Sequence, residues 1–171
     1  MNIKMPALPM TADAYVIKNP YETKNAFTKT DIDSAAAPLR LVDAVSADEF
    51  KRLLRGYDFT FISTNELKAI ASLLQERELA DVYVMDFLML GNMAFDKYGR
   101  QAQMDVKFNA VAMFSQMLDE RMVCRKKWVE NTSLESFDQI TQGLVKVNHL
   151  MGALSYFVGS DQSNLSISYS V

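Results

Sequence analysis

Residues 137–158, FDQITQGLVKVNHLMGALSYFV, decide the fold of this chain. Apolar side chains recur there at alternating steps of three and four: Phe137, Ile140, Leu144, Val147, Met151, Leu154 and Val158. This spacing places all seven on one stripe of a helix, as in a coiled-coil seam. So narrow a stripe needs a second helix to lie against. The stretch therefore predicts a long helix packed lengthwise on another helix, either of the same chain or of a partner.

A neighbour is available in the same chain. Residues 103–127 are predicted to form a second long helix, with one stripe made of Met104, Phe108, Val111, Ser115, Leu118 and Met122. The connection is short, and Thr132 with Glu135 has the spacing of a capping box at the start of the next helix. Two helices joined in this way are expected to pack antiparallel.

Two further capping boxes predict shorter helices upstream. Ser46 with Glu49, and Ser63 with Glu66, place a hydroxyl three residues before a carboxylate, so each side chain can bond the other's backbone N–H. Gly56 is expected to follow the end of the first of these helices.

Residues 81–90 fit either a strand or a helix. Val82, Tyr83 and Val84 favour a strand, whereas Val82, Met85 and Met89 share a helical face. Gly91 stands where a helix C-cap is expected, and no second convincing strand exists to pair with this one. We therefore predict a helix.

Together these patterns predict an all-α fold, a bundle-like domain of four or five helices over residues 45–159. Three of the four prolines, Pro6, Pro9 and Pro20, lie in the first twenty residues, and no apolar period persists before Ser46. Residues 1–44 are thus expected to form a flexible, poorly ordered N-terminal arm, pinned near Tyr15. Residues 160–171 are expected to form a loose C-terminal tail.

The composition excludes several classes of protein. The chain has 171 residues, of which 49% are hydrophobic and 23% charged, the balance of one globular domain. A net charge of -3 supplies no general attraction to nucleic acid or to an anionic membrane. No apolar run is long enough for a transmembrane helix, and residues 1–10 do not look like a secretory signal. The single cysteine, Cys124, favours the reducing cytoplasm.

No pattern of catalytic or metal-binding residues is present. His149 is the only histidine, and zinc or copper sites built on histidine need companion ligands. Cys124 lies beside basic residues, which favour the thiolate, yet it can pair with His149 only if the two long helices bring them together. We therefore predict no catalytic residue, no cofactor and no metal site.

Two surface motifs have plain structural explanations. The basic cluster is Arg121, Arg125, Lys126 and Lys127, with Trp128 beside it. It can contact phosphate, but cations at the last turn of a helix also stabilise that helix, so nucleic-acid binding is not expected.

The motif Asp96-Lys97-Tyr98-Gly99 departs from a calcium loop, because Arg100 and Lys107 stand where oxygen ligands are required.

One short segment of the chain resembles a segment found in a group of bacterial proteins. Tyr57-Asp58-Phe59, followed by Ile62-Ser63 and Glu66-Leu67, resembles a segment of small, uncharacterised bacterial helical proteins, in which a Tyr-Asp-Phe turn precedes a helix capped by serine or threonine. This chain has Thr64-Asn65 where that segment has proline. The resemblance implies a cytoplasmic bacterial helical protein and implies no activity or cofactor.

Two functions remain open at this point. The first is a small cytoplasmic protein–protein interaction protein, an adaptor or regulator, whose partner is an unidentified protein or a second copy of the chain. The alternative is a small-ligand binder or an enzyme, with its pocket between helices and with Cys124, His149 or Tyr83 near it.

Overall fold

The computed structural model describes residues 11–41, 44–128 and 134–165, and the side chains of 11–41, 46–125 and 137–159. The predicted all-α class is confirmed: the described part holds helices and three isolated β-bridges, with no strand. The elements are α1 (Ile32–Ala36), a 3-10 turn η1 (Ala37–Leu39), α2 (Ala44–Leu53), α3 (Thr64–Glu76), α4 (Val82–Leu90), α5 (Ala110–Trp128) and α6 (Leu134–Leu165). No described helix has the length and hydropathy needed to span a bilayer.

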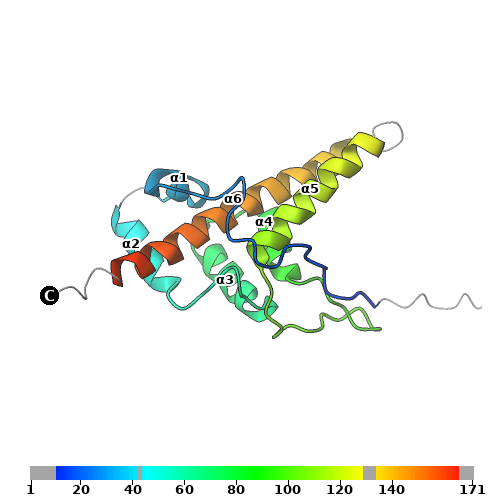
Figure 1. Ribbon diagram of the computed structural model, residues 1–171, viewed down its shortest axis with the longest axis horizontal. Coiled ribbons are helices and arrows are strands. Elements are labelled where there is room, and N and C mark those ends of the chain that lie inside the picture. The colour runs from blue at the N-terminus through cyan, green and yellow to red at the C-terminus, as the bar shows by residue number, and fades with distance from the viewer. Residues whose placement is uncertain (1–10, 42–43, 129–133, 166–171) are drawn as a thin grey trace, which may run out of the picture.

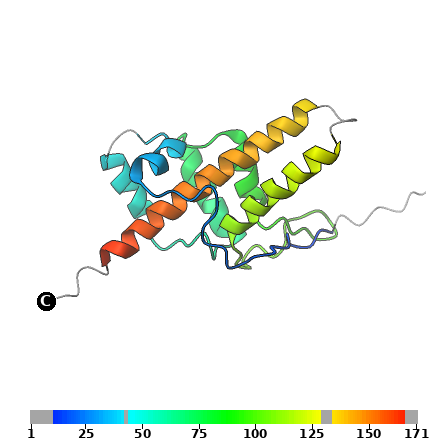
Figure 2. The same ribbon diagram turned by 45° about the horizontal axis from the view of Figure 1, so that its top comes forward.

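Helix α6 is the axis of the molecule. It runs diagonally through both views, with α5 antiparallel beside its first half and α1 and α2 near its second half (Figures 1 and 2). It contacts α1, η1, α2, α4 and α5, whereas α3 reaches the bundle mainly through α4. One hydrophobic core unites side chains from all these elements.

The predicted seam is buried in its middle and exposed toward its start. Its buried members are Leu144, Val147, Met151 and Leu154. Ile140 is 43% exposed, and Phe137 and Val158 are half-buried. Leu150 and Phe157, which lie off the stripe, are buried as well. The helix is therefore a central helix covered on several sides rather than half of a two-stranded coil.

The helix predicted over 103–127 begins later than expected, at Ala110. Asn109 ends the preceding loop, and its Oδ1 accepts the N–H of Ala112 at 2.9 Å, as an N-cap does. Phe108 instead exchanges two backbone hydrogen bonds with Ile62, of 2.9 and 2.8 Å. Met104 and Phe108 are thus not on the helical stripe, because pairing with the segment before α3 and the asparagine cap replace the first turns.

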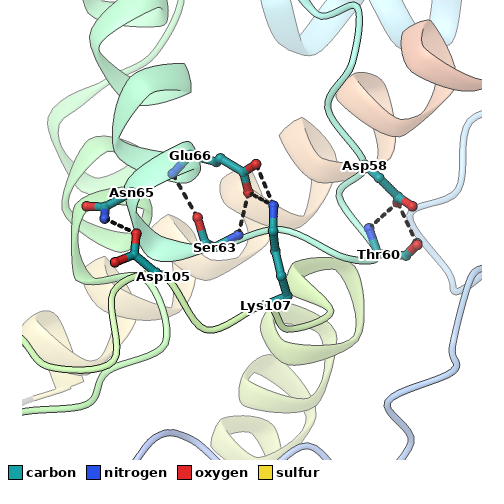
Figure 3. A network of polar contacts seen from close by, with 7 residues as sticks. All are labelled: Asp58, Thr60, Ser63, Asn65, Glu66, Asp105 and Lys107. Atoms are coloured by element: carbon teal, nitrogen blue, oxygen red, sulfur yellow. Dashed lines mark hydrogen bonds and ion pairs between the residues drawn. The ribbon is translucent and has the colours of Figure 1, made fainter.

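The capping box at Ser63 is confirmed. The Ser63 hydroxyl accepts the N–H of Glu66 at 3.2 Å, and the Glu66 carboxylate accepts the N–H of Ser63 at 2.8 Å (Figure 3). The same carboxylate accepts hydrogen bonds from Lys107, and the Asn65 amide donates to Asp105 at 2.7 Å. The start of α3 therefore also anchors the loop that leads to α5.

The capping box expected at Ser46 is wrong. Helix α2 begins at Ala44, which places Ser46 within its first turn. Glu49 accepts a hydrogen bond from Arg77 at 3.0 Å, at the end of α3, and so serves an interhelical contact. The third proposed box, Thr132 with Glu135, lies outside the described residues.

Residues 82–90 form the helix α4, as predicted. Asp81 is its N-cap, with Oδ1 accepting the N–H of Val84 at 3.1 Å. Gly91 follows the helix with a φ of 54°, and a Cβ there would come within 2.4 Å of the Thr64 side chain. Glycine is required for both the backbone conformation and this close approach.

The end of α6 differs from the expected loose tail. The helix continues past Gly159 to Leu165, so residues 160–165 are helical rather than loop. Residues with good intrinsic helix propensity are few here, and propagation from the long packed helix costs less than starting a new one. Residues 166–171 lie outside the described part.

The expected N-terminal arm is ordered in part. Residues 11–41 contain α1 and η1, which the sequence did not predict, and Ala35 and Leu39 are fully buried in the common core. Tyr15 is pinned as expected: its hydroxyl donates to Glu120 at 2.7 Å, and its backbone N–H donates to Asn92 at 2.9 Å. The domain boundary at residue 44 stays a prediction.

Candidate functional site

A pocket forms where residues 29–40 cross α6 beside the start of α4. Its volume is about 550 Å³, within the range of small-molecule sites. It is lined by Lys29, Ser34, Ala37, Pro38, Arg40, Leu79, Ala80, Asp81, Val84, Lys146, His149 and Leu150. The lining thus combines four basic side chains, one carboxylate and an apolar floor.

The segment that carries Lys29 is held by an unusually close backbone contact. A Cβ added at Gly152 of α6 would lie only 2.0 Å from the Phe27 carbonyl oxygen. Glycine at this position therefore allows the chain to lie directly on the helix. Further along, Arg40 ends η1 with a left-handed φ of 52°, which turns the chain at the rim of the pocket. Both cations are positioned by backbone geometry.

His149 is half-buried and lies beside Lys29. The Lys29 ammonium is 3.0 Å from Nδ1 of the imidazole, and the Phe27 ring packs edge-on against it with 4.9 Å between centroids. An ammonium group can only donate, so Nδ1 is the acceptor and the neutral ring carries its proton on Nε2. Burial lowers the pKa of His149 below its usual value, and the Lys29 charge lowers it further. The imidazole is therefore neutral at neutral pH.

Lys146 and Asp81, which also line the pocket, form an ion pair. Their ammonium and carboxylate lie 2.5 Å apart, and Asp81 also caps α4. Partial burial alone would raise the pKa of Asp81, but the hydrogen bonds from Lys146 and from Val84 outweigh it, so the pKa is lowered. Neither Lys29 nor Arg40 has a carboxylate partner among the described residues. Among the described residues, the pocket thus carries two positive charges that have no ion-pair partner.

The floor below these charges is apolar. Val84 of α4 and Leu150 of α6 are buried, and Leu79 is half-buried. A cavity with charged and apolar lining residues favours a solute with an anionic end and a short hydrocarbon body.

The three residues suggested for a ligand site separate in the structure. His149 lines the cationic pocket, whereas Tyr83 lies 39% exposed on α4 near Gly143 and does not line it. Cys124 is exposed on α5 at the level of Asp138, since the adjacent Arg125 is 3.3 Å from that carboxylate. His149 lies eleven residues further along α6, about 16 Å at 1.5 Å per residue. A thiol–imidazole pair is therefore not formed.

Cys124 lines a different pocket, of about 580 Å³, between α5 and the arm. One of the carboxylates in its lining, Glu120, already accepts hydrogen bonds from the arm. The Lys18 ammonium and the Tyr15 hydroxyl bond to it and lower its pKa to about 2. The polar groups here hold the arm on α5.

The described part of the basic cluster makes internal contacts. The Arg121 guanidinium stacks on the Phe137 ring at 4.1 Å and donates to the Thr141 hydroxyl at 2.9 Å. Arg125 pairs with Asp138. Both arginines therefore join α5 to α6, and the side chains of residues 126–128 lie outside the described part.

Asp96 forms a turn, as predicted for Tyr98-Gly99. Its Oδ1 accepts the N–H groups of Tyr98 and Arg100, at 2.8 and 2.9 Å. Within the described residues, no group of three or more His, Cys, Asp or Glu side chains is placed to hold a metal ion.

Four of the residues that give the pocket its charge were not anticipated: Lys29, Arg40, Asp81 and Lys146. Lys29 is 120 positions from His149, and Asp81 is 65 positions from Lys146, so no local spacing reveals either pair. The one local signal is that Lys146, His149 and Leu150 share a face of α6 at helical spacing.

Comparison with protein-family models, with curated proteins and with solved structures finds no match to this chain.

Proposed function

We propose that this protein binds a small anionic molecule in the pocket lined by Lys29, Arg40 and His149. The observation that carries the proposal is the pair of cations without carboxylate partners in the described structure, above a floor of buried apolar side chains. Lys29 is half-buried, and a half-buried charge attracts an anion more strongly than a fully solvated charge does. The proposal includes no chemical step.

Titration calorimetry with short-chain carboxylates and phosphate esters tests this function. His149 supplies a second readout, because it is the only histidine and its ring signals in an NMR spectrum need no assignment. An anion beside Lys29 offsets the charge that lowers the His149 pKa, so that pKa is expected to rise on binding.

Lys29→Met is the deciding variant, with Lys24→Met as its control. Both lysines belong to the same arm, but Lys24 does not line this pocket. Binding should weaken about tenfold or more in Lys29→Met, the loss expected for a charged hydrogen bond, and stay unchanged in Lys24→Met. Equal loss in the two variants, or no binding by the wild type, would overturn the proposal.

The second candidate is a protein–protein interaction at the outer end of α5 and α6, with a second copy of the chain as the partner. There the two helices extend together from the rest of the bundle (Figures 1 and 2). Ile140 of the seam, and Met122 and Val123 of α5, are each at least 40% exposed. A seam that continues into solvent favours self-association.

Sedimentation of the wild type against Ile140→Asp distinguishes this second candidate. Concentration-dependent dimerisation that is lost in Ile140→Asp supports it, and a wild type that stays monomeric to high concentration contradicts it. Both candidates suit the cytoplasm, since the single cysteine leaves no intrachain disulfide for an oxidising compartment to form.

A further inference from the structure

We infer that the anionic group recognised by the pocket is a phosphate monoester, held between Lys29 and Arg40, with its ester carbons on the floor formed by Val84 and Leu150. This inference rests on the proposed binding function and narrows it to one class of ligand.

The charge of the pocket matches a dianion. The ionisable groups that face it are Lys29 from the arm, Arg40 after η1, Asp81 before α4, and Lys146 and His149 from α6. The charges of Lys146 and Asp81 cancel, because the ammonium and the carboxylate lie 2.5 Å apart. The His149 ring is neutral while its Nδ1 accepts a hydrogen bond from the Lys29 ammonium. Two positive charges remain. A phosphate monoester carries about -1.5 to -2 charges at pH 7, whereas a monocarboxylate leaves one cation without a counter-charge.

The donors exceed what a carboxylate can accept. An arginine presents five N–H groups in a planar fork, and the Lys29 ammonium has three, of which one is directed at His149. The Nε2–H of the neutral imidazole adds another. A phosphate monoester offers three terminal oxygens with a charge-assisted acceptor on each, and arginine engages two of them at once. A carboxylate offers only two oxygens in one plane.

The floor of the pocket limits the rest of the ligand. Val84 and Leu150 are buried and Leu79 is half-buried, so part of the pocket lining is hydrocarbon. Burial of apolar area is favourable, so an ester chain that covers these side chains binds more tightly than the bare anion. Alkyl phosphates are therefore expected to bind more tightly than inorganic phosphate.

The test compares n-butyl phosphate, pentanoate and inorganic phosphate by titration calorimetry at pH 7.5, where the ester is mainly a dianion. We expect n-butyl phosphate to bind at least about tenfold more tightly than pentanoate or inorganic phosphate. We also expect it to raise the His149 pKa in an NMR titration. The three probes separate the contributions of charge and of hydrocarbon.

Asp81→Asn sharpens the test because it changes the charge and keeps the fold. Asparagine caps a helix as well as aspartate, so α4 keeps its start, while Lys146 loses its counter-charge. Affinity for n-butyl phosphate should rise severalfold in this variant. Arg40→Gln should lower it about tenfold, and Lys24→Met, outside the pocket, should leave it unchanged.

The outcomes separate the two proposals. If pentanoate binds as tightly as n-butyl phosphate, the phosphate class is wrong and anion binding stands. If no probe binds and His149 does not shift, both are wrong. If n-butyl phosphate binds equally well to wild type, Arg40→Gln and Asp81→Asn, it binds elsewhere and the assignment of this pocket is wrong.

Discussion

On helix α6, which contacts α1, η1, α2, α4 and α5, the stripe residues Leu144, Val147, Met151 and Leu154 are buried, whereas Ile140 of the same stripe is 43% exposed. The two regions have one sequence pattern and different surroundings. Periodicity states which side chains share a face, and tertiary contacts decide whether that face is buried. Pairs of matched substitutions at buried and exposed positions test this difference directly.

The largest effect is expected at Leu144, which is 2% exposed. Leu144→Ala should lower the free energy of unfolding by about 2–5 kcal/mol, because it removes buried methyl groups and leaves a cavity. Ile140→Ala, one step along the stripe and 43% exposed, should change it by less than about 1 kcal/mol. Urea denaturation of both variants measures the two values. Equal losses would mean that the outer end of α6 is also covered.

A glycine pair should give effects of opposite sign. A Cβ at Gly152 would lie 2.0 Å from the Phe27 carbonyl, whereas a Cβ at Gly159 would have nothing within 4 Å. Gly152→Ala should therefore destabilise by about 1–3 kcal/mol, as overpacking does, despite the better helix propensity of alanine. Gly159→Ala should stabilise by about 0.5–1 kcal/mol.

Limited proteolysis adds a readout of the arm to this glycine pair. In Gly152→Ala, residues 20–30 should be cleaved faster, because Phe27 and Lys29 are displaced from α6. Unchanged cleavage together with unchanged stability would contradict the close backbone contact on which the pocket depends.

A serine pair in one helix compares a helix end with its interior. Ser63→Ala removes the cap of α3 and should cost about 1 kcal/mol. Ser72 lies inside α3, where its hydroxyl donates to the Lys68 carbonyl at 3.1 Å. Ser72→Ala should stabilise by a few tenths of a kcal/mol, because alanine is the better helix former. Thermal unfolding of the two variants checks the sign of each change.

The parts of the fold that could be predicted are those with a local cause. The Ser63 cap, the Asp81–Gly91 helix and the long helix around Leu144 each follow from neighbours within a few positions. The start of α5 was misplaced because Phe108 pairs with Ile62, 46 positions away, and the helical stripe continues across that segment. The hydroxyl–carboxylate spacing at Ser46 does not mark a helix start, because α2 begins at Ala44.

The candidate site was predictable only at His149. Its other charged residues reach the pocket through Gly152 and the left-handed Arg40, which are features of backbone geometry rather than of periodicity. The prolines and balanced charges of the arm gave the sequence pattern of a poorly ordered segment. Nothing local indicated that Ala35 and Leu39 are buried, because their burial depends on contact with α6. A boundary at residue 44 would divide that core.

The smallest effect concerns the arm at its other anchor, Glu120, and depends on pH. Its pKa is lowered from 4.5 to about 2 by the hydrogen bonds from Lys18 and Tyr15. A carboxyl whose folded pKa is depressed stabilises the fold above its unfolded pKa, and this stabilisation is lost as pH falls. The side chain is 43% exposed, so solvent screening keeps the effect small. The difference in melting temperature between wild type and Glu120→Gln should therefore be constant above pH 5 and shrink between about pH 4.5 and pH 2.

Glu76→Gln, at an exposed position at the end of α3, is the control and should show no such convergence. A difference that persists to pH 2 would mean that Glu120 acts through packing, and that the arm is held mainly by Phe27 on Gly152.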